Sequence, residues 1–526
     1  MNKFKYMNKK HITILDSTLR DGAQGEDISF SVSDKLNIMH ALDEFGVSYI
    51  EAGNPGSNPK DLEFFEAAAK TTLKHAKLCA FGSTRRKDRT AESDENVASL
   101  LRANTSVIVV FGKTWDLHVR DILNAEPQEN LDMIADTVAY LKSKGKEVIF
   151  DAEHFFDGYI ANSDYAMQVL HTAANAGADM LCLCDTNGGK LPMHIADITK
   201  TVCGEFETPI GIHTHNDSGC AVANALMAVE AGAVHVQGTF VGFGERCGNA
   251  DLSSIIPSLT LKTDYECDGN LSMLSYTAGR IAEIANVIVR NNTPYIGKSA
   301  FTHKAGMHID GVLKNSASFE HVDPGVVGNT RKLLISEVAG RNTVLEKTKS
   351  FAPELSKDSP ELSAIVEKLK DMEHYGYQFE AADASFELLV KKVLGRYTPY
   401  FTLVMYRTMG EFPAPEGEMQ ATATIKVEVD GKTEITAAMG KGPVNALDIA
   451  LRKALTVFYP QLKDMQLSDY KVRVLEQQAA TAAKVRVLIE SSDKDSSWNT
   501  IGVSEDIIEA SLTALIDSIE YKLSKD

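Results

Sequence analysis

Short apolar runs rich in β-branched residues alternate with longer segments of helical spacing over the first half of the chain. Each run ends in a polar or glycine-containing turn, and the segments between runs, such as 33–46 and 224–233, carry apolar residues at three- and four-residue intervals. This switch of period predicts strands alternating with helices. The expected strands span residues 12–16, 48–53, 77–82, 106–112, 147–153, 179–185, 209–215 and 233–240.

Eight such strand–helix units in succession predict an α/β fold, a (β/α)8 TIM barrel. An open, doubly wound parallel sheet is the alternative. The first run is not followed by a Gly-x-Gly-x-x-Gly motif, which disfavours a dinucleotide-binding version of that sheet.

The pattern changes after about residue 270. Residues 273–291 and 344–377 have helical spacing, whereas 291–345 are rich in glycine, asparagine and histidine without clear periodicity. From about 383 the runs FELLVKKV, ATATIKVEV and KVRVLIE alternate as strands do, with an amphipathic helix at 445–458. We therefore expect a barrel over 1–272, a mostly helical linker over 273–382, and a C-terminal α+β domain over 383–526.

The bulk composition is that of a soluble enzyme. The chain has 526 residues, too many for one core, and is 44% hydrophobic and 24% charged. No apolar run approaches the ~20 residues of a membrane span, and a net charge of −18 argues against a nucleic-acid surface. The seven cysteines are scattered, and the start lacks the apolar core of a signal peptide, so we expect a cytoplasmic protein without disulfides.

Polar side chains gather where the predicted strands end. In a (β/α)8 barrel these positions meet at one mouth, which is where the chemistry of such barrels takes place. The polar residues at the predicted strand ends are Arg20, Asp21, Glu51, Asp151, Glu153, Asp185, Thr186, Asn187, His213, His215, Asn216 and Asp217, and the last run leads into GFGERCGN at 242–249.

His213 and His215 lie one residue apart in GIHTHNDSG, at the end of a predicted strand. Residues i and i+2 of a strand point to the same side, so both imidazoles would face one ligand. The pair alone could equally be structural, and Asp21 alone could be a turn residue before Gly22. Together, two imidazoles and one carboxylate form a set that binds a divalent cation and leaves positions open for substrate.

Arg20 precedes Asp21 and adds a cation to the same mouth. It could simply pair with a carboxylate there, just as Glu51, Glu153 and Asp185 could serve only as ion-pair partners. Beside a metal it favours a substrate that carries or develops negative oxygen, and a 2-oxo acid has this chemistry.

Three motifs in this order give a resemblance to a known family. LDSTLRDGAQ (15–24), HTHNDSGCAVANALMAVEAGA (213–233) and GFGERCGNADL (242–252) resemble the acyl-CoA-condensing synthases of the isopropylmalate, homocitrate and citramalate group, within the DRE-TIM metallolyases. The similarity continues through AFTHKAGMHIDGVLKN (300–315) and GKGPVNALDIALRKAL (440–455), so it covers nearly the whole chain.

The details most resemble the citramalate-forming branch of this family. Ala23-Gln24-Gly25-Glu26 replaces the Glu-Gln-Ser-Pro usual in isopropylmalate-forming members, which favours pyruvate over 2-oxoisovalerate. The implied reaction joins acetyl-CoA, pyruvate and water to give (R)-citramalate and CoA, for isoleucine biosynthesis. A 2-isopropylmalate synthase, a related acyl-CoA lyase or carboxyl-transferring enzyme, and a catalytically silent amino-acid sensor are the alternatives.

The resemblance also implies roles for individual residues. Asp21, His213, His215 and, more weakly, Asn249 would bind one divalent ion: Mn²⁺, Zn²⁺, Co²⁺ or Mg²⁺. Arg20, Glu51 and Thr186 are the predicted substrate-binding residues, and Arg20, Glu153 and His308 the predicted catalytic ones. His308, from the region after the barrel, would assist deprotonation of acetyl-CoA.

The C-terminal domain resembles the dimerising, end-product-binding domain of these synthases. The resemblance implies a homodimer with isoleucine as feedback inhibitor, bound near residues 440–445. A passive dimerisation module is the alternative reading of the same residues.

Overall fold

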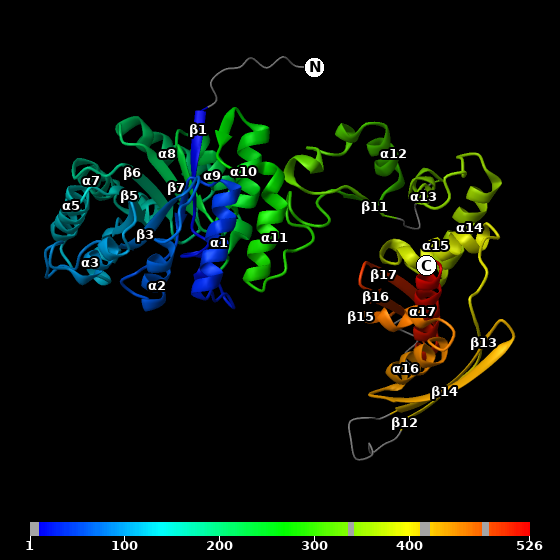
Figure 1. The fold of residues 1–526 in the computed structure, drawn as a ribbon. Helices are drawn as coiled ribbons and strands as arrows, with labels where there is room; N and C mark the ends of the chain where they lie inside the picture. Colours follow the sequence, from blue (N-terminus) through cyan, green and yellow to red (C-terminus); the bar gives the residue numbers. More distant parts are fainter. Residues whose placement is uncertain (1–9, 335–340, 411–420, 476–482, 526) are drawn as a thin grey trace. The chain divides into compact units, whose positions relative to one another are not determined.

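The computed structural model describes residues 10–334, 341–410, 421–475 and 483–525. The chain divides into two compact units (Figure 1). The first holds residues 1–301 and 321–331, and the second holds residues 302–320 and 332–526. Within the described ranges, no helix is long and apolar enough to cross a membrane.

Eight parallel strands close into a barrel in the first unit. β1 pairs with both β2 and β8, and the other strands pair in sequence order, which confirms the barrel and rules out the open sheet. A further strand, β9 (Tyr265–Cys267), pairs with the start of β1. The barrel strands are β1 (Lys10–Asp16), β2 (Tyr49–Glu51), β3 (Lys77–Ser83), β4 (Val107–Lys113), β5 (Glu147–Glu153), β6 (Met180–Asp185), β7 (Ile210–Thr214) and β8 (His235–Gly238).

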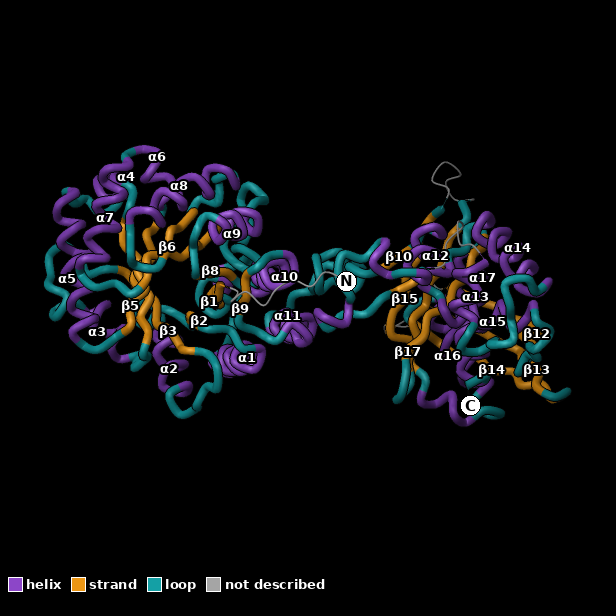
Figure 2. Tube along the Cα trace, turned by 90° about the horizontal axis from the view of Figure 1, so that it is seen from above, coloured by secondary structure: helices purple, strands orange, loops and turns teal. Residues whose placement is uncertain are grey.

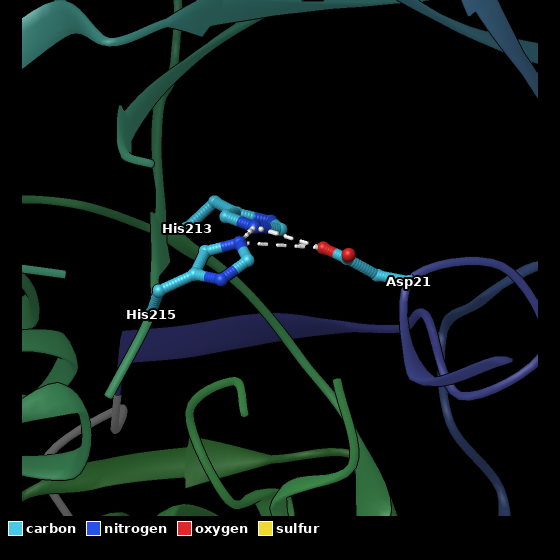
Figure 3. A group of neighbouring side chains, drawn as sticks. All are labelled: Asp21, His213 and His215. Carbon is cyan, nitrogen blue, oxygen red and sulfur yellow. Dashed lines mark hydrogen bonds and ion pairs between the residues drawn. The ribbon is translucent and has the colours of Figure 1, made fainter. Parts of the chain in front are cut away.

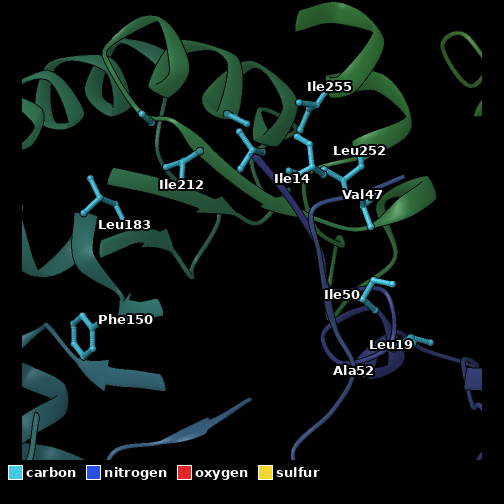
Figure 4. Close-up of a cluster of buried hydrophobic side chains, with 14 of the residues drawn as sticks. Ile14, Leu19, Val47, Ile50, Ala52, Phe150, Leu183, Ile212, Leu252 and Ile255 are labelled. Atoms are coloured by element: carbon cyan, nitrogen blue, oxygen red, sulfur yellow. The ribbon is translucent and has the colours of Figure 1, made fainter. Parts of the chain in front are cut away.

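Helices lie around these strands (Figure 2). Alternate strand residues face outward, and many of them, such as Ile14, Leu183 and Ile212, are fully buried in one core with helical residues such as Leu252 and Ile255 (Figure 4). The helices of this unit are α1 (Val32–Phe45), α2 (Pro59–Ala68), α3 (Glu95–Arg102), α4 (Asp116–Asp121), α5 (Pro127–Ser143), α6 (Phe155–Ala161), α7 (Ser163–Asn175), α8 (Pro192–Glu205), α9 (Ala221–Glu230), α10 (Leu252–Lys262) and α11 (Leu274–Ile284).

The intervening strand residues point into the barrel. Val109, Ile149 and Cys182 belong to a separate inner apolar cluster. Because side chains of a strand alternate, the residue two positions after Ile149 also faces inward, and that residue is Asp151. The same alternation turns His213 inward on β7, so the inner surface changes from apolar to polar toward the carboxyl ends of the strands.

The second unit contains two copies of one arrangement, a three-stranded antiparallel sheet followed by a helix. The first copy is β12 (Thr402–Gly410), β13 (Ala421–Val429), β14 (Lys432–Gly440) and α16 (Pro443–Leu455), and the second is β15 (Gln466–Val474), β16 (Val485–Ser492), β17 (Ser497–Ser504) and α17 (Ile507–Leu523). The unit also has β10 (Thr302–His303), β11 (Lys332–Leu333), α12 (Gly306–Lys314), α13 (Arg341–Thr348), α14 (Pro360–Tyr375) and α15 (Asp383–Val393). The predicted C-terminal α+β region is confirmed, and the domain boundaries predicted at 272 and 382 stay predictions.

The strand predicted for FELLVKKV, residues 386–393, is wrong, because this run lies in α15. Phe386, Leu389 and Val390 recur at three- and four-residue spacing and are buried with Leu362 and Ile365 of α14. A short apolar run fits either period, and here packing on a neighbouring helix decides for the helix. The prediction also missed α12, which lies in the stretch without clear periodicity.

Candidate active site

Asp21, His213 and His215 converge at the mouth of the barrel (Figure 3). The Nε2 atoms of the two histidines are 3.1 Å apart, and the Asp21 Oδ2 atom is 3.2 Å from His213 Nε2 and 3.5 Å from His215 Nε2. All three side chains are buried. Two come from the end of β7 and the third from the turn after β1, so closure of the barrel brings together the set that the sequence predicted. Such a mixed nitrogen and oxygen set suits a divalent cation.

Asn249 lies beside this set. Its Nδ2 atom is 2.9 Å from Asp21 Oδ2 and 3.4 Å from His213 Nε2, and among the described residues no donor reaches its buried Oδ1 atom. A half-turn of the amide exchanges the two atoms, which would direct the oxygen to Asp21 and His213. The loop closes on Asn249 because residue 244 is glycine: a Cβ atom there would lie 1.9 Å from Asn249 Oδ1.

Arg20 is fixed by three contacts. Its Nε atom donates to Glu51 Oε2 at 2.7 Å, its Nη1 atom lies 3.3 Å from Asp21 Oδ2, and its guanidinium carbon lies 3.7 Å from the Phe81 ring centroid. Glu51 is fully buried and also accepts a hydrogen bond from Ser17. Its present contacts make Glu51 a support for Arg20, and its predicted part in substrate binding stays a prediction.

These side chains share a cavity of about 270 Å³. Glu153, paired with Lys113, and Thr186, whose Oγ1 atom accepts a hydrogen bond from the His154 amide at 2.9 Å, also line it. The cavity is lined by Arg20, Asp21, Gln24, Phe81, Phe111, Asp151, Glu153, Cys184, Thr186, His213, His215, Glu245 and Arg246. Six of the predicted site residues are therefore neighbours around one space.

His308 belongs to the second unit. It is exposed on α12, where its ring stacks on Phe319 with centroids 4.3 Å apart. Its predicted role in deprotonation stays a prediction.

The electrostatics of the site favour an ionised Asp21. Burial alone would raise the pKa of this carboxyl, but Arg20 and the two histidines hold the pKa well below its usual range. Burial lowers the pKa of His215. For His213 the effect of burial is outweighed by Asp21, which leaves its pKa above the ordinary value. The site thus offers a negative carboxylate beside two imidazoles.

Arg246 is a site residue that the sequence analysis missed. Its Nε atom donates to Asp217 at 2.8 Å, and its Nη2 atom lies 2.7 Å from the Thr186 carbonyl oxygen and 3.3 Å from His215 Nδ1. Its backbone φ of 57° is unusual for a non-glycine residue, as is often found at functional sites. The available signal was an arginine in the loop after the eighth strand, in the same motif as Asn249.

Comparisons with known proteins agree with this geometry. A family model described as HMGL-like matches residues 11–287, one described as a homocitrate synthase post-HMGL domain matches 295–376, and one described as the LeuA allosteric (dimerisation) domain matches 380–523. The (R)-citramalate synthase of Aquifex aeolicus is 52% identical, and that of Geobacter sulfurreducens 50% identical, each over 98% of this chain and 98% of the relative.

A probable 2-isopropylmalate synthase from Methanopyrus kandleri is more distant, at 32% identity over 97% of both chains. Matches of such length and identity leave no doubt about ancestry, and they favour the citramalate-forming branch over the isopropylmalate-forming one. The chain belongs to the (R)-citramalate synthase family.

Proposed function

We propose that this chain condenses acetyl-CoA with pyruvate and water to form (R)-citramalate and CoA. The observation that carries the proposal is the convergence of Asp21, His213 and His215 on the same cavity as Arg20. A cation-binding set next to a guanidinium fits a small 2-oxo acid, whose carboxylate and ketone oxygens both need positive partners.

The ligand set fits one divalent ion. Asp21, His213 and His215 would hold it, and Asn249, whose Oδ1 atom lacks a donor among the described residues, would add an oxygen. Such an ion supplies Lewis-acid activation of the ketone.

The chain's own residues would do the rest. Arg20, held in place by Glu51, offers its remaining N–H groups to the substrate carboxylate and to the oxygen that gains charge as the carbon–carbon bond forms. Phe81 and Phe111 stack with ring centroids 5.2 Å apart and keep one wall of the cavity dry. We assign to Glu153 and His308 the positioning and removal of the proton from the acetyl methyl group. Hydrolysis of the thioester then makes the condensation irreversible.

A panel of 2-oxo acids tests the assignment. With acetyl-CoA and a divalent metal, release of free CoA should be fastest with pyruvate and should stop when a chelator is added. Metal added back from the series Mn²⁺, Zn²⁺, Co²⁺ and Mg²⁺ should restore it and identify the best ion. A faster rate with 2-oxoisovalerate would show that the enzyme forms isopropylmalate instead, and CoA release without any 2-oxo acid would refute the synthase.

We further propose that isoleucine binds in the second unit. A cavity of about 570 Å³ lies at the start of α16, next to the segment predicted for the effector. Val444 and Leu467 give it apolar walls, and the ion pair of Asp448 and Arg452 gives it one group of each charge for the ammonium and carboxylate of an amino acid. The lining residues are Gly442, Pro443, Val444, Asn445, Asp448, Arg452, Gln466, Leu467 and Tyr470.

The outer face of the sheet β12–β13–β14 supports the proposed homodimer. One face of this sheet packs on α16, while Met405, Met409, Ile435 and Met439 are 40%, 60%, 60% and 54% exposed. The pairing of Met405 with Lys426 and of Lys426 with Ile435 places these residues on one face. An apolar open sheet face of this kind marks a protein–protein contact. Ile435→Asp with Met439→Asp should therefore give monomers by light scattering, whereas Val457→Asp, on an exposed surface of the same unit, should not.

A further inference from the structure

Three inward-facing residues are hydrogen-bonded in series inside the barrel. His213 Nδ1 lies 2.9 Å from Gln237 Oε1, and Gln237 Nε2 lies 2.8 Å from Asp151 Oδ1. They come from β7, β8 and β5, and their exposed fractions are 5%, 1% and 3%. His213 and Gln237 are partners in the register of neighbouring strands, whereas Asp151 reaches Gln237 across the barrel.

The direction of these bonds fixes the protons. An ionised carboxylate only accepts hydrogen bonds, so Gln237 must turn its NH₂ group to Asp151 and its carbonyl oxygen to His213. A carbonyl oxygen also only accepts, so the proton of the neutral His213 ring must be on Nδ1. The lone pair is then on Nε2, the atom that faces Asp21 and His215.

We propose that Asp151 is a positioning residue that acts through Gln237 to hold His213 in its metal-binding tautomer. The inference rests on the proposed metal site and adds the residues behind His213 that hold this ligand in place. Partners of this kind orient metal-ligating histidines, and their loss typically weakens metal affinity or activity by about 10- to 100-fold.

Asp151 could instead be a ligand of a second metal ion. Its carboxylate and the thiols of Cys182 and Cys184 have ligand atoms within 4.8 Å of one another, so they could hold a second metal ion. Burial raises the thiol pKa of Cys184 to about 11 and that of Cys182 well above its ordinary value. Protonated thiols are poor ligands, and Asp151 already accepts a hydrogen bond from Gln237. The structure therefore favours the hydrogen-bonded relay of Asp151, Gln237 and His213 over a second metal site.

Binding of Mn²⁺ to the metal-free full-length protein tests the relay. Titration calorimetry at pH 8 is suitable because burial raises the pKa of Asp151 to about 7, which leaves the carboxylate ionised. Asp151→Ala and Gln237→Leu should each raise the dissociation constant for Mn²⁺ by about 10- to 100-fold. The double variant should bind no more weakly than Gln237→Leu, because Asp151 acts only through Gln237. Additive losses, or an unchanged constant in either single variant, would overturn the relay.

Exchanging the amide and the carboxylate between positions 237 and 151 tests whether Mn²⁺ affinity can be restored. In the double variant Gln237→Glu with Asp151→Asn, the new carboxylate accepts from both His213 Nδ1 and the new amide. This variant should regain Mn²⁺ affinity to within about three-fold of wild type, and affinity no better than that of Gln237→Glu alone would contradict the relay. Because the swap preserves size and net charge, it also keeps the test valid if Asp151→Ala does not fold.

Stoichiometry separates the relay from the second metal site. We expect one Mn²⁺ per chain both in the wild type and in Cys182→Ala. If the wild type binds a second Mn²⁺ per chain that both Cys182→Ala and Asp151→Ala lose, Asp151 belongs to a metal site with Cys182 and Cys184, and the relay is overturned. No binding by the wild type would refute the proposed function and the relay together, whereas tight wild-type binding that the variants do not alter would refute the relay alone.

Discussion

The barrel mouth and the cavity at the start of α16 differ in the charge of their lining residues and in how far apart those residues lie in the sequence. At the mouth, Arg20 and Asp21 from the turn after β1 meet His213 from β7; Asp21 and His213 are buried, Arg20 is partly buried, and the three hold one another by charge. The other cavity is larger and is lined largely by the neighbouring residues 442–445 and by β15. Bond-forming chemistry needs charges fixed before the substrate arrives, because reorganisation would raise the barrier. Recognition of an effector, which we propose for the α16 cavity, needs a shaped space with few polar groups.

The comparison implies different sensitivities to mutation. Removing one member of a buried charged set leaves the others unpaired, which is costly, whereas filling an apolar cavity only excludes its ligand. Changes at the mouth should therefore abolish turnover, and changes at the α16 cavity should alter regulation alone.

The largest effect is expected for His213→Ala. Loss of one imidazole from the set should lower turnover by at least ~10³-fold and abolish tight Mn²⁺ binding. Far-ultraviolet circular dichroism should be unchanged, since the side chain lies inside a formed barrel. The control His171→Ala, at an exposed helical position paired with Glu205, should keep wild-type CoA release. Substantial turnover in His213→Ala would contradict the assigned site.

Arg20→Lys should have the next largest effect. A lysine provides a single point charge and cannot bind Glu51, stack on Phe81 and face the substrate at the same time. We expect kcat with pyruvate to fall by ~10²-fold while Mn²⁺ affinity is retained, and steady-state kinetics with metal titration would separate the two. Arg120→Lys, in the exposed pair with Asp116, is the matched control. An Arg20 variant that lost metal but kept its kcat at saturating metal would show a purely structural role.

Val444→Trp is the corresponding test in the second unit. The larger side chain should fill the cavity and raise the isoleucine concentration for half-inhibition by at least ~10-fold, with kcat in the absence of isoleucine within two-fold of wild type. Val457→Trp, which is 63% exposed and does not line the cavity, should be inhibited normally. Unchanged inhibition of Val444→Trp would place the effector elsewhere, and loss of basal activity would remove the contrast between the two regions.

A smaller effect, on stability alone, is expected for Asp16 in the barrel. Burial raises its pKa to about 7, whereas the unfolded chain ionises near ~4. Between these values the folded state keeps a proton that the unfolded state has lost, so its stability falls as pH rises, by at most ~1.4 kcal/mol per pH unit, and is constant above pH 7. Asp16→Asn should remove this slope. Urea unfolding of the barrel, followed by Trp115 fluorescence in a Trp498→Phe background, would detect it, and parallel pH profiles for the two proteins would contradict it.

The sequence was most informative about the fold, where the strand–helix period repeats, and about those site residues that the closure of the barrel brings together. Eight alternations were enough to predict the barrel, and barrel closure alone brings Asp21 next to His213. It was least informative where a residue's importance depends on its partner. Gln237 and Phe81 look like ordinary strand residues, and only the structure shows one accepting from His213 and the other stacking on Arg20. The helix at Phe386 was missed because a short apolar run carries no period of its own.

The two sheet-and-helix copies of the second unit differ at the residue just before the helix. The side chain of Asp506, before α17, accepts from the Ile508 amide and caps the helix start, whereas Gly442, before α16, has no side chain to do so. Pro443 has no N–H group, so the amides of the first turn of α16 that receive no side-chain cap are those of Val444 and Asn445, and both residues line the cavity. If the proposed effector binds there, we expect its carboxylate to supply the cap that α16 lacks and that α17 already has.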